Sequence, residues 1–531
     1  MMSEHTKYSL LILIAGIICF SSFLPNDYLG LDDRYAVFAQ EMLRNGPTFF
    51  PTSYGKPYPD YPATTTLMTY FASLPGGRVT PFTATIPTAI ASALILMLIF
   101  RIGAIHSLRW GLAGVGFLLL TKTFISLSRC VSPDQFVSMF TALGFYIIYS
   151  ADMSGNNRRL FWIPFVFAGG FLVRGPIGLI IPAAVVCTYC LMDKKLKLFS
   201  TMALSAVLSM VLCSAGLLSA AKYQGGDAFM NDVIQMQVMG RLYEKGHGIL
   251  YYFSESFYKY AICYPAAIIT IIIFWNKIWK REESEYRLLA KLIIWAFIVL
   301  IGMSIVSAKK ERYILAAMPA LALISGWLIN GEKDEVRAFK LKQAFLRLCK
   351  FIPALACICV VAIGYFNLLN TEINWHVASM LTGILAIGVW VADKHLKSEI
   401  NEILKMGAGV LTLLILIINI SEPYACAIEE SRPFVEKVIS MQEKRPGRIV
   451  LYQLVRDGEA LKFLAIYEKP VYPQFIDKAE EITSCRPGSY IIVAEKAFKQ
   501  LPEKVKTFMT IAYKGKLDGD EYLVLLRKLR E

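Results

Sequence analysis

Long apolar runs separated by short polar segments make up most of this chain. A helix needs about 20 mainly apolar residues to cross a bilayer, and by that criterion we predict about thirteen membrane-spanning helices. They lie at roughly 8–24, 84–105, 111–128, 133–150, 161–173, 175–192, 199–221, 257–276, 287–307, 311–329, 349–369, 375–392 and 405–421. The pattern therefore predicts a polytopic α-helical membrane protein.

The pattern changes after Ser421, where charged and apolar residues become mixed. Short β-like runs at 448–454 and 489–494 flank a helical stretch at 457–467. Such alternation is typical of a small α/β unit. We predict a transmembrane domain over residues 1–423 and a soluble α/β domain over residues 424–531.

The charge of the chain supports a topology. Of its 531 residues 56% are hydrophobic, and its net charge is +14. A strongly basic chain could bind nucleic acid, but the Lys and Arg residues fall mainly in alternate short loops, such as 158–159 and 194–197. Cytoplasmic loops are enriched in this way. We therefore predict no nucleic acid partner, a cytoplasmic N-terminus, and outer positions for the loops 25–83 and 222–256 and for the C-terminal domain.

The first outer loop holds an acidic pair, Asp32 and Asp33, followed by Arg34 and Tyr35. Apolar residues recur at helical spacing over 34–43, which predicts a short amphipathic helix on the membrane interface. A carboxylate there could accept a proton from an acceptor group or help to hold a divalent cation. A helix cap is the structural alternative.

A proline-rich segment, 57–62, follows in the same loop and contains Tyr58, Asp60 and Tyr61. Proline fixes the backbone, so Asp60 could point toward the same pocket as Asp32. A rigid turn without a chemical role is the alternative.

The outer loop 222–256 carries Gln235, Gln237, Arg241 and His247. His247 lies between two glycines, which allow a backbone to approach a ligand closely. The residue could bind phosphate or a metal ion.

Basic residues also gather where the topology predicts outer helix ends. Lys309, Lys310 and Arg312 share a very short loop, and Arg174 precedes Gly175. Cations in outer loops depart from the rule that Lys and Arg are enriched in cytoplasmic loops, and phosphate binding would explain them. The alternatives are that the protein simply tolerates these charges, or that a span is miscounted. Asp134 opens a span, either as a helix cap or as a pocket residue.

Taken in order over about residues 8–330, these motifs resemble those of the aminoarabinose lipid A transferases and the dolichyl-phosphate-mannose protein mannosyltransferase-like enzymes, which are C-type (GT-C) glycosyltransferases. The matching segments are Asp32–Tyr35 with Glu41–Leu43, Pro57–Pro62, Ser128–Arg129 with Asp134, Arg174–Pro176, Gly240–Arg241, His247–Gly248 with Tyr251–Tyr252, and Ser307–Tyr313.

The resemblance implies a GT-C fold in the inner (plasma) membrane and transfer of a sugar from a polyprenyl-phosphate carrier to an outer acceptor. The acceptor would be a lipid A-like glycolipid, a glycan or a protein. Asp32 or Asp33, with Asp60, would activate or position the acceptor. The implied phosphate-binding residues are Lys309, Lys310, Arg312, Arg174 and Arg241, and the implied substrate contacts are Arg34, Tyr35, Tyr58, Tyr61, His247 and Asp134.

The chain departs from the family pattern at three places. The acidic pair directly adjoins Arg34, Asp60-Tyr61 replaces the common Glu-Lys, and Gln235 and Gln237 stand where relatives have acidic or histidine residues. Amides are weak metal ligands. No cofactor is therefore implied with certainty, and a divalent ion on Asp60 and His247 stays open.

Three other functions remain open. A lipid-linked sugar transporter or flippase would favour polar residues deep inside spans. A polysaccharide polymerase or ligase would use arginines and a histidine in a large outer loop, as Arg241 and His247 allow. A silent scaffold would tolerate substitution of Asp32 and Asp33.

Overall fold

The computed structural model describes residues 4–25, 28, 32–59, 62–239, 248, 250–306, 309–331, 335–396, 398–465 and 471–528. The side chains of 32, 33, 238, 239 and 398 are outside this description. Four residues with a predicted role, Asp60, Tyr61, Arg241 and His247, also lie outside the described residues.

Within the described part of the chain, nine helices are long and apolar enough to cross a membrane. They are α1 (Glu4–Ser21), α4 (Pro81–Ala104), α7 (Pro133–Ser154), α10 (Leu196–Ile234), α14 (Ser284–Ile305), α15 (Met318–Asn330) with the preceding 3-10 helix η4 (Glu311–Ala317), α16 (Val336–Tyr365), α17 (Trp375–His395) and α18 (Ser398–Leu416).

Two further apolar segments are bent helix pairs. In one, α5 (Leu108–Leu119) meets α6 (Lys122–Ser128) at 79°; in the other, α12 (Tyr251–Lys259) meets α13 (Cys263–Lys280) at 110°. Two shorter apolar helices, α8 (Ile163–Arg174) and α9 (Pro176–Met192), complete the set. Every predicted run thus coincides with an apolar helix or a bent pair, and the prediction of a polytopic helical fold is confirmed.

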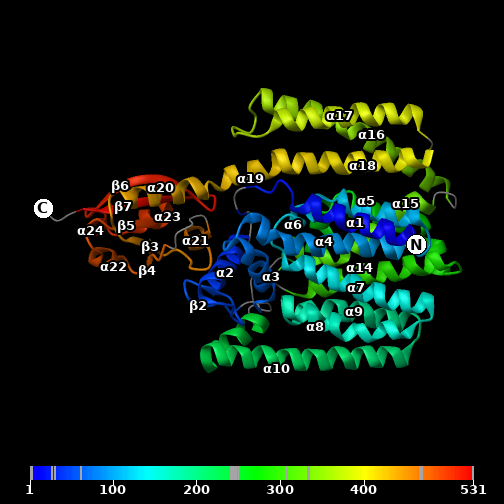
Figure 1. The fold of residues 1–531 in the computed structure, drawn as a ribbon, viewed down its shortest axis with the longest axis horizontal. Helices are drawn as coiled ribbons and strands as arrows, with labels where there is room; N and C mark the ends of the chain where they lie inside the picture. Colours follow the sequence, from blue (N-terminus) through cyan, green and yellow to red (C-terminus); the bar gives the residue numbers. More distant parts are fainter. Residues whose placement is uncertain are drawn as a thin grey trace.

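The helix α15 forms the centre of the bundle and is buried along nearly its whole length. Buried indole groups hold this segment: Trp110 donates to the Leu323 carbonyl of α15 at 2.7 Å, and Trp295 donates to the Ala316 carbonyl of the preceding η4 at 2.9 Å. In Figure 1, α10 and α17 lie on opposite outer sides of the bundle. Their largely exposed apolar surfaces suit contact with lipid.

The segment predicted as the outer loop 222–256 is helical over its first third, which corrects that expectation. The helix α10 continues to Ile234 with a break at Gly226, and a π-helical turn, Gln235–Met239, follows. Its polar composition suggested a loop, but Phe229 and Val233 pack against Phe50 of the first loop. Gln224 also bonds both backbone groups of Phe50, at 2.8 and 2.9 Å. Tertiary contacts therefore stabilise a helix that the sequence pattern alone does not favour.

The loop after α1 forms α2 (Asp32–Asn45), the short strands β1 (Thr52–Ser53) and β2 (Lys56–Pro57), and α3 (Thr64–Ser73). The helix predicted over 34–43 is confirmed, and its place on the membrane interface stays a prediction, although protein covers much of its apolar side. The consecutive residues 35–39 are all buried. Val37 packs against Leu461 and Leu464 of the C-terminal fold, so protein covers the side of α2 that we expected to face lipid or water.

The C-terminal fold contains a five-stranded sheet in the order β4-β3-β5-β7-β6. The strand β3 pairs in parallel with β4 and β5, whereas β7 pairs antiparallel with β5 and β6. Its strands are β3 (Ile449–Tyr452), β4 (Gln474–Ile476), β5 (Tyr490–Ala494), β6 (Met509–Leu517) and β7 (Asp520–Arg527). Its helices are α20 (Ser431–Lys444), η7 (Glu459–Leu461), α21 (Lys462–Ala465), α22 (Ala479–Ser484), α23 (Glu495–Gln500) and α24 (Glu503–Lys506).

The two predicted β-like runs are confirmed as β3 and β5. Of the helix expected over 457–467, residues 459–465 are helical as η7 and α21, and residues 466 and 467 lie outside the described residues. We did not predict the hairpin of β6 and β7, although its turn, Asp518-Gly519, is a typical hairpin signal. Both residues have positive φ, 55° and 81°.

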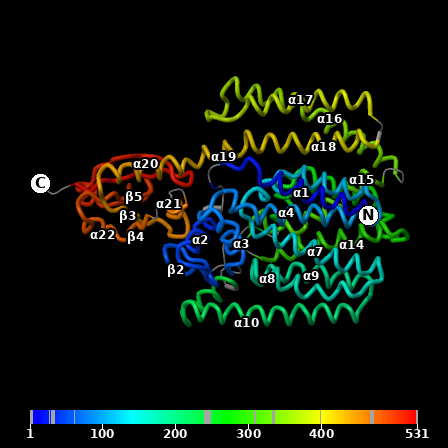
Figure 2. Tube along the Cα trace, viewed as in Figure 1, coloured from blue at the N-terminus to red at the C-terminus, as the bar shows by residue number. Residues whose placement is uncertain are grey.

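The last span leads directly into the C-terminal fold. From α18 the chain passes through a π-helical turn, Ile417–Ser421, into α19 (Glu422–Glu429), as Figure 2 shows. Figure 1 places the C-terminal fold at one end of the bundle and the N-terminus at the other. The helix α2 lies between the bundle and the C-terminal fold.

Candidate functional site

Three charged residues meet where α7 begins, α8 ends and η4 starts. Asp134, in the first turn of α7, has Oδ1 3.2 Å from Nε of Arg174 and Oδ2 3.1 Å from Nε of Arg312. The Tyr313 ring lies 5.5 Å from the Arg174 guanidinium carbon and 5.7 Å from that of Arg312. Buried charges need such pairing. Two cations share one carboxylate, so the cluster carries a net positive charge.

The two arginines differ in accessibility. The Arg174 side chain is 2% exposed, whereas that of Arg312 is 22% exposed. The cavity beside them has a volume of about 20 Å³, which is room for roughly one water molecule. It is lined by Asp134, Val137, Arg174, Ile177, Ile181, Met303, Arg312, Tyr313 and Ala316. An anion larger than water would therefore reach this cluster from the exposed side of Arg312.

The turn after Arg174 needs glycine for two reasons. Gly175 has a φ of +65°, which side-chain-bearing residues rarely adopt. A Cβ at this position would also lie 2.6 Å from Oε1 of Gln237. Gln237 stands where the family pattern has an acidic or histidine residue, and in the structure its side chain packs against the turn that presents Arg174.

The basic segment 309–312 is held by hydroxyl groups from the bent pair α12 and α13. Tyr252 donates to the Lys310 carbonyl at 3.1 Å, and Tyr260 donates to the Glu311 carbonyl at 2.9 Å. Lys309 is 8% exposed and donates to the Val306 carbonyl at 2.8 Å, whereas the Lys310 side chain is exposed. The structure thus places Arg312 at the charged cluster and Lys310 on the surface beside it.

Arg34, Tyr35 and Tyr58 contact other parts of the protein. Arg34 donates from Nη1 to the Tyr58 hydroxyl at 2.9 Å and from Nη2 to the Asp457 carbonyl at 2.7 Å. Tyr35 and Tyr58 are buried with Phe38 in one cluster. These contacts fix the start of α2, and the predicted role of the three residues in substrate binding stays a prediction.

The acidic pair opens α2, because the helix begins at Asp32. The side chains of the pair are outside the description, so a catalytic role and the alternative of a helix cap both stay predictions. The same position brings the pair next to Arg34 and so to the contact with the C-terminal fold.

Two residues that no motif of the sequence marks, Ser53 and Tyr54, join the first loop to the C-terminal fold. The Ser53 hydroxyl donates to the Asp457 carboxylate, and the Tyr54 hydroxyl donates to the Ala460 carbonyl at 2.6 Å. Buried Glu41 accepts from the Thr52 hydroxyl and the Gly55 amide. Burial, and secondarily the Glu41 charge, raise the pKa of Tyr54. The hydroxyl therefore remains a donor at neutral pH.

Arg129, part of the motif Ser128-Arg129, is buried and contacts other parts of the protein. It is 4% exposed and bonds Glu422 at 2.6 and 2.9 Å. It also donates to the carbonyls of Cys19 at 3.0 Å, Ser22 at 2.8 Å and Phe23 at 3.0 Å. This arginine joins the end of α1 to the start of α19.

Whether the protein binds a divalent metal ion depends on residues outside the described ranges. Among the residues whose placement the structure describes, no group of three or more His, Cys, Asp or Glu side chains could hold a metal ion. Asp60 and His247, the predicted candidates, are not among them.

Comparison with solved structures identifies the fold. The apo crystal structure of ArnT from Cupriavidus metallidurans matches with a TM-score of 0.72 and 12% identity, over 98% of both chains. The chain therefore has the same fold, the GT-C fold that the sequence predicts. ArnT from the same organism bound to undecaprenyl phosphate matches with a TM-score of 0.71, again at 12% identity over 98% of both chains.

Sequence comparisons agree with this GT-C assignment. The family model described as dolichyl-phosphate-mannose-protein mannosyltransferase matches residues 57–218. An uncharacterized protein of Aquifex aeolicus is 26% identical over 223 residues, which are 41% of this chain and 43% of that relative. The family match over residues 57–218 agrees with the resemblance noted from the motifs, and the chain is a multi-pass membrane protein with the GT-C fold.

Proposed function

We propose that this GT-C protein is a membrane glycosyltransferase that moves a sugar from a polyprenyl-phosphate carrier to an envelope acceptor on the extracytoplasmic face. The observation that carries this proposal is the cluster of Arg174, Asp134 and Arg312 where α8 ends, α7 begins and η4 starts. The similar ArnT structure with bound undecaprenyl phosphate supports a lipid phosphate as the donor.

The arginine cluster suits a departing phosphate. In an inverting transfer an acceptor oxygen attacks the anomeric carbon, and the bond from that carbon to the phosphate oxygen breaks. The electron pair passes to the phosphate, whose added charge is stabilised by nearby cations. Arg312 would contact the phosphate directly, because a guanidinium binds phosphate through paired hydrogen bonds.

Arg174 would act beside Arg312, with Asp134 holding both guanidinium groups in place. Lys309, Lys310 and Arg241 would add further positive charge. The cavity of about 20 Å³ is too small for a phosphate group, so the donor would approach from the exposed side of Arg312.

The acidic pair would serve the acceptor. Asp32 or Asp33 would take the proton of an acceptor hydroxyl, or orient the acceptor when it is itself a phosphate and needs no base. Asp60, Tyr61 and His247 belong to the same predicted substrate region. We propose the inner (plasma) membrane as the location, and a lipid A-like glycolipid, a glycan or a protein as the acceptor.

The first test is mass spectrometry of envelope lipids and glycans from cells that lack the gene and carry wild type, Asp32→Asn, Asp33→Asn or Arg312→Ala. We expect a sugar-sized mass to disappear from one acceptor in the deletion, in Arg312→Ala and in at least one Asp variant. Lys222→Ala is the matched control, because it removes an exposed cation of α10 whose nearest partner is Asp227 at 2.8 Å.

The other outcomes would refute the proposal. A lipid-linked sugar that accumulates without loss of any modified acceptor would indicate transport. Loss of long polysaccharide chains, with single-sugar modifications intact, would indicate a polymerase or ligase. A modified acceptor that persists in all three variants would indicate a scaffold.

A further inference from the structure

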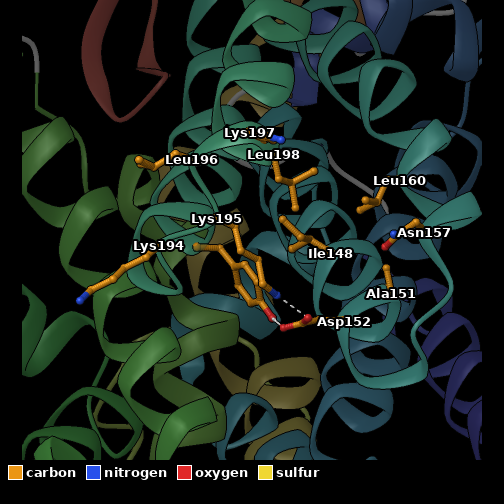
Figure 3. Close-up of a pocket in the computed structure, with 11 residues that line it drawn as sticks. Ile148, Ala151, Asp152, Asn157, Leu160, Lys194, Lys195, Leu196, Lys197 and Leu198 are labelled. Atoms are coloured by element: carbon orange, nitrogen blue, oxygen red, sulfur yellow. Dashed lines mark hydrogen bonds and ion pairs between the residues drawn. The ribbon is translucent and has the colours of Figure 1, made fainter.

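A second cavity lies at the other end of the bundle, remote from the arginine cluster. Its volume is about 610 Å³, and it is bordered by the end of α7, the 3-10 helix η2 (Asn157–Trp162) and the turn between α9 and α10. The lining residues are Ile148, Ala151, Asp152, Asn157, Leu160, Tyr189, Lys194, Lys195, Leu196, Lys197 and Leu198. Figure 3 shows how they surround the space.

Positive charge exceeds negative charge around this cavity. Lys195 pairs with Asp152 and lies 3.6 Å from Asp193. Lys291, 8% exposed, lies 2.7 Å from Asp193 and 4.0 Å from the centre of the Tyr189 ring. The residues that line the cavity include three lysines, Lys194, Lys195 and Lys197, and one carboxylate, Asp152, a net charge of +2 (3 − 1).

The excess comes from Lys194 and Lys197, which border the cavity and have exposed side chains. Figure 3 shows Lys195 turned toward Asp152, whereas Lys194 points away from that carboxylate. Lys194 also has a φ of +55°, a conformation that a lysine rarely adopts. The tight turn thus presents two lysines whose charges Asp152 and Asp193 do not neutralise.

The rest of the lining is apolar, from Ile148, Leu160, Leu196 and Leu198. Three aromatic residues near the cavity in sequence, Phe161, Trp162 and Phe165, are 66%, 58% and 56% exposed. Aromatic side chains gather at the level of lipid headgroups. The cavity therefore combines a basic edge with apolar walls at the depth where a lipid has its phosphate and the start of its acyl chains.

We propose that this cavity binds the headgroup of an anionic phospholipid from the leaflet that the charge rule predicts to be cytoplasmic. Lys194 and Lys197 bind the phosphate oxygens, and the leucine and isoleucine side chains contact the acyl chains. Basic pockets between helices are suited to anionic headgroups, and the net positive charge selects against zwitterionic lipids. The proposal does not depend on the proposed transferase activity, because the two sites lie at opposite ends of the bundle.

The test is native mass spectrometry of the full-length protein, released from detergent with phosphatidylglycerol or phosphatidylcholine. We expect wild type to retain one more phosphatidylglycerol than the variant Lys194→Glu/Lys197→Glu, with at least tenfold weaker binding in the variant. Lys194→Gln/Lys197→Gln serves if charge reversal prevents folding. The control, Arg337→Glu/Lys340→Glu, alters two exposed cations of α16, and it should bind like wild type.

Three results would overturn the proposal. Equal retention of phosphatidylglycerol by wild type and both lysine variants would show that the cavity does not bind the headgroup. Equal retention of phosphatidylcholine would remove the basis for charge selection. Displacement of the lipid by millimolar inorganic phosphate, with the same lysine dependence, would assign the cavity to a soluble anion.

Discussion

Asp134 and Arg312 form an ion pair between the start of α7 and η4, with 3.1 Å between Oδ2 and Nε. The same carboxylate binds Arg174 through its other oxygen. Because these residues come from three separate helical segments, a single aspartate holds together the end of the bundle at which we place the donor phosphate.

Replacing Asp134 should destabilise the protein strongly. Asp134→Asn leaves two guanidinium groups facing a neutral amide, and removing one partner of a buried ion pair costs about 3 kcal/mol or more. Thermal unfolding followed by tryptophan fluorescence would show a large fall in midpoint. A midpoint within a degree of wild type would contradict this role for Asp134; Asp134→Glu keeps the charge and serves as the control.

Replacing Arg312 should affect activity more than stability. Its side chain is 22% exposed, and Asp134 keeps Arg174 as a partner when Arg312 is lost. We expect Arg312→Ala to lower kcat/KM for a polyprenyl-phosphate sugar by roughly 100-fold, the range seen when a group that stabilises transition-state charge is removed. Arg312→Lys should recover part of the loss. An unchanged kcat/KM in Arg312→Ala would exclude it from the donor site.

The contact of Arg34 with the C-terminal fold should position the acidic pair. Arg34→Met removes the bonds to Tyr58 and to the Asp457 carbonyl, so we expect a drop in transfer rate of about tenfold, since small displacements of reacting groups slow chemistry strongly. Limited proteolysis should cut near residue 457 faster in the variant. Lys56→Met, an exposed cation in the same loop, should match wild type in both assays.

Arg129 and Glu422 should show strong coupling. Each single variant, Arg129→Met or Glu422→Leu, leaves a buried charge without its partner, at a cost of about 3–5 kcal/mol. The double variant should lose less than the sum of the two. It should still fall short of wild type, because the carbonyls of Cys19, Ser22 and Phe23 lose their donor. Unfolding midpoints of all four proteins give the coupling, and strict additivity would be inconsistent with the pairing.

Gly175→Ala should destabilise the turn that presents Arg174. Backbone strain of this kind costs about 1–3 kcal/mol, and the added methyl group would collide with Gln237 Oε1. The second change Gln237→Ser relieves the collision but not the strain, so the double variant should recover only partly. Full recovery in the double variant would mean that the positive φ of Gly175 has little energetic effect.

The sequence predicts the bundle well because each apolar run forms its own backbone hydrogen bonds and needs no partner to be recognised as a helix. The sequence also marks Asp134, Arg174 and Arg312 as candidate functional residues, because charged groups next to a span cost free energy unless they are paired or have a function. Their mutual contact was not predictable, because the three residues are far apart in the chain and only tertiary packing brings them together.

The contact between α2 and the C-terminal fold could not be predicted either. Ser53 and Asp457 are ordinary polar residues in their own segments, and nothing local marks them as partners. For that reason the sequence does not show that protein covers much of the apolar side of α2. The polar end of α10 is likewise predicted as a loop from its composition, whereas it is helical because Phe50 of the first loop packs against it.

The helix that leaves the membrane has a further consequence. Because α18, its π-helical turn and α19 follow one another without an intervening loop, the C-terminal fold has a rotational setting fixed by the phase of that helix. An α-helix turns about 100° per residue, so inserting or deleting one residue between α18 and α19 would swing Asp457 around the helix axis and away from Arg34. The length of this connection therefore sets the rotational register between the C-terminal fold and the helix bundle.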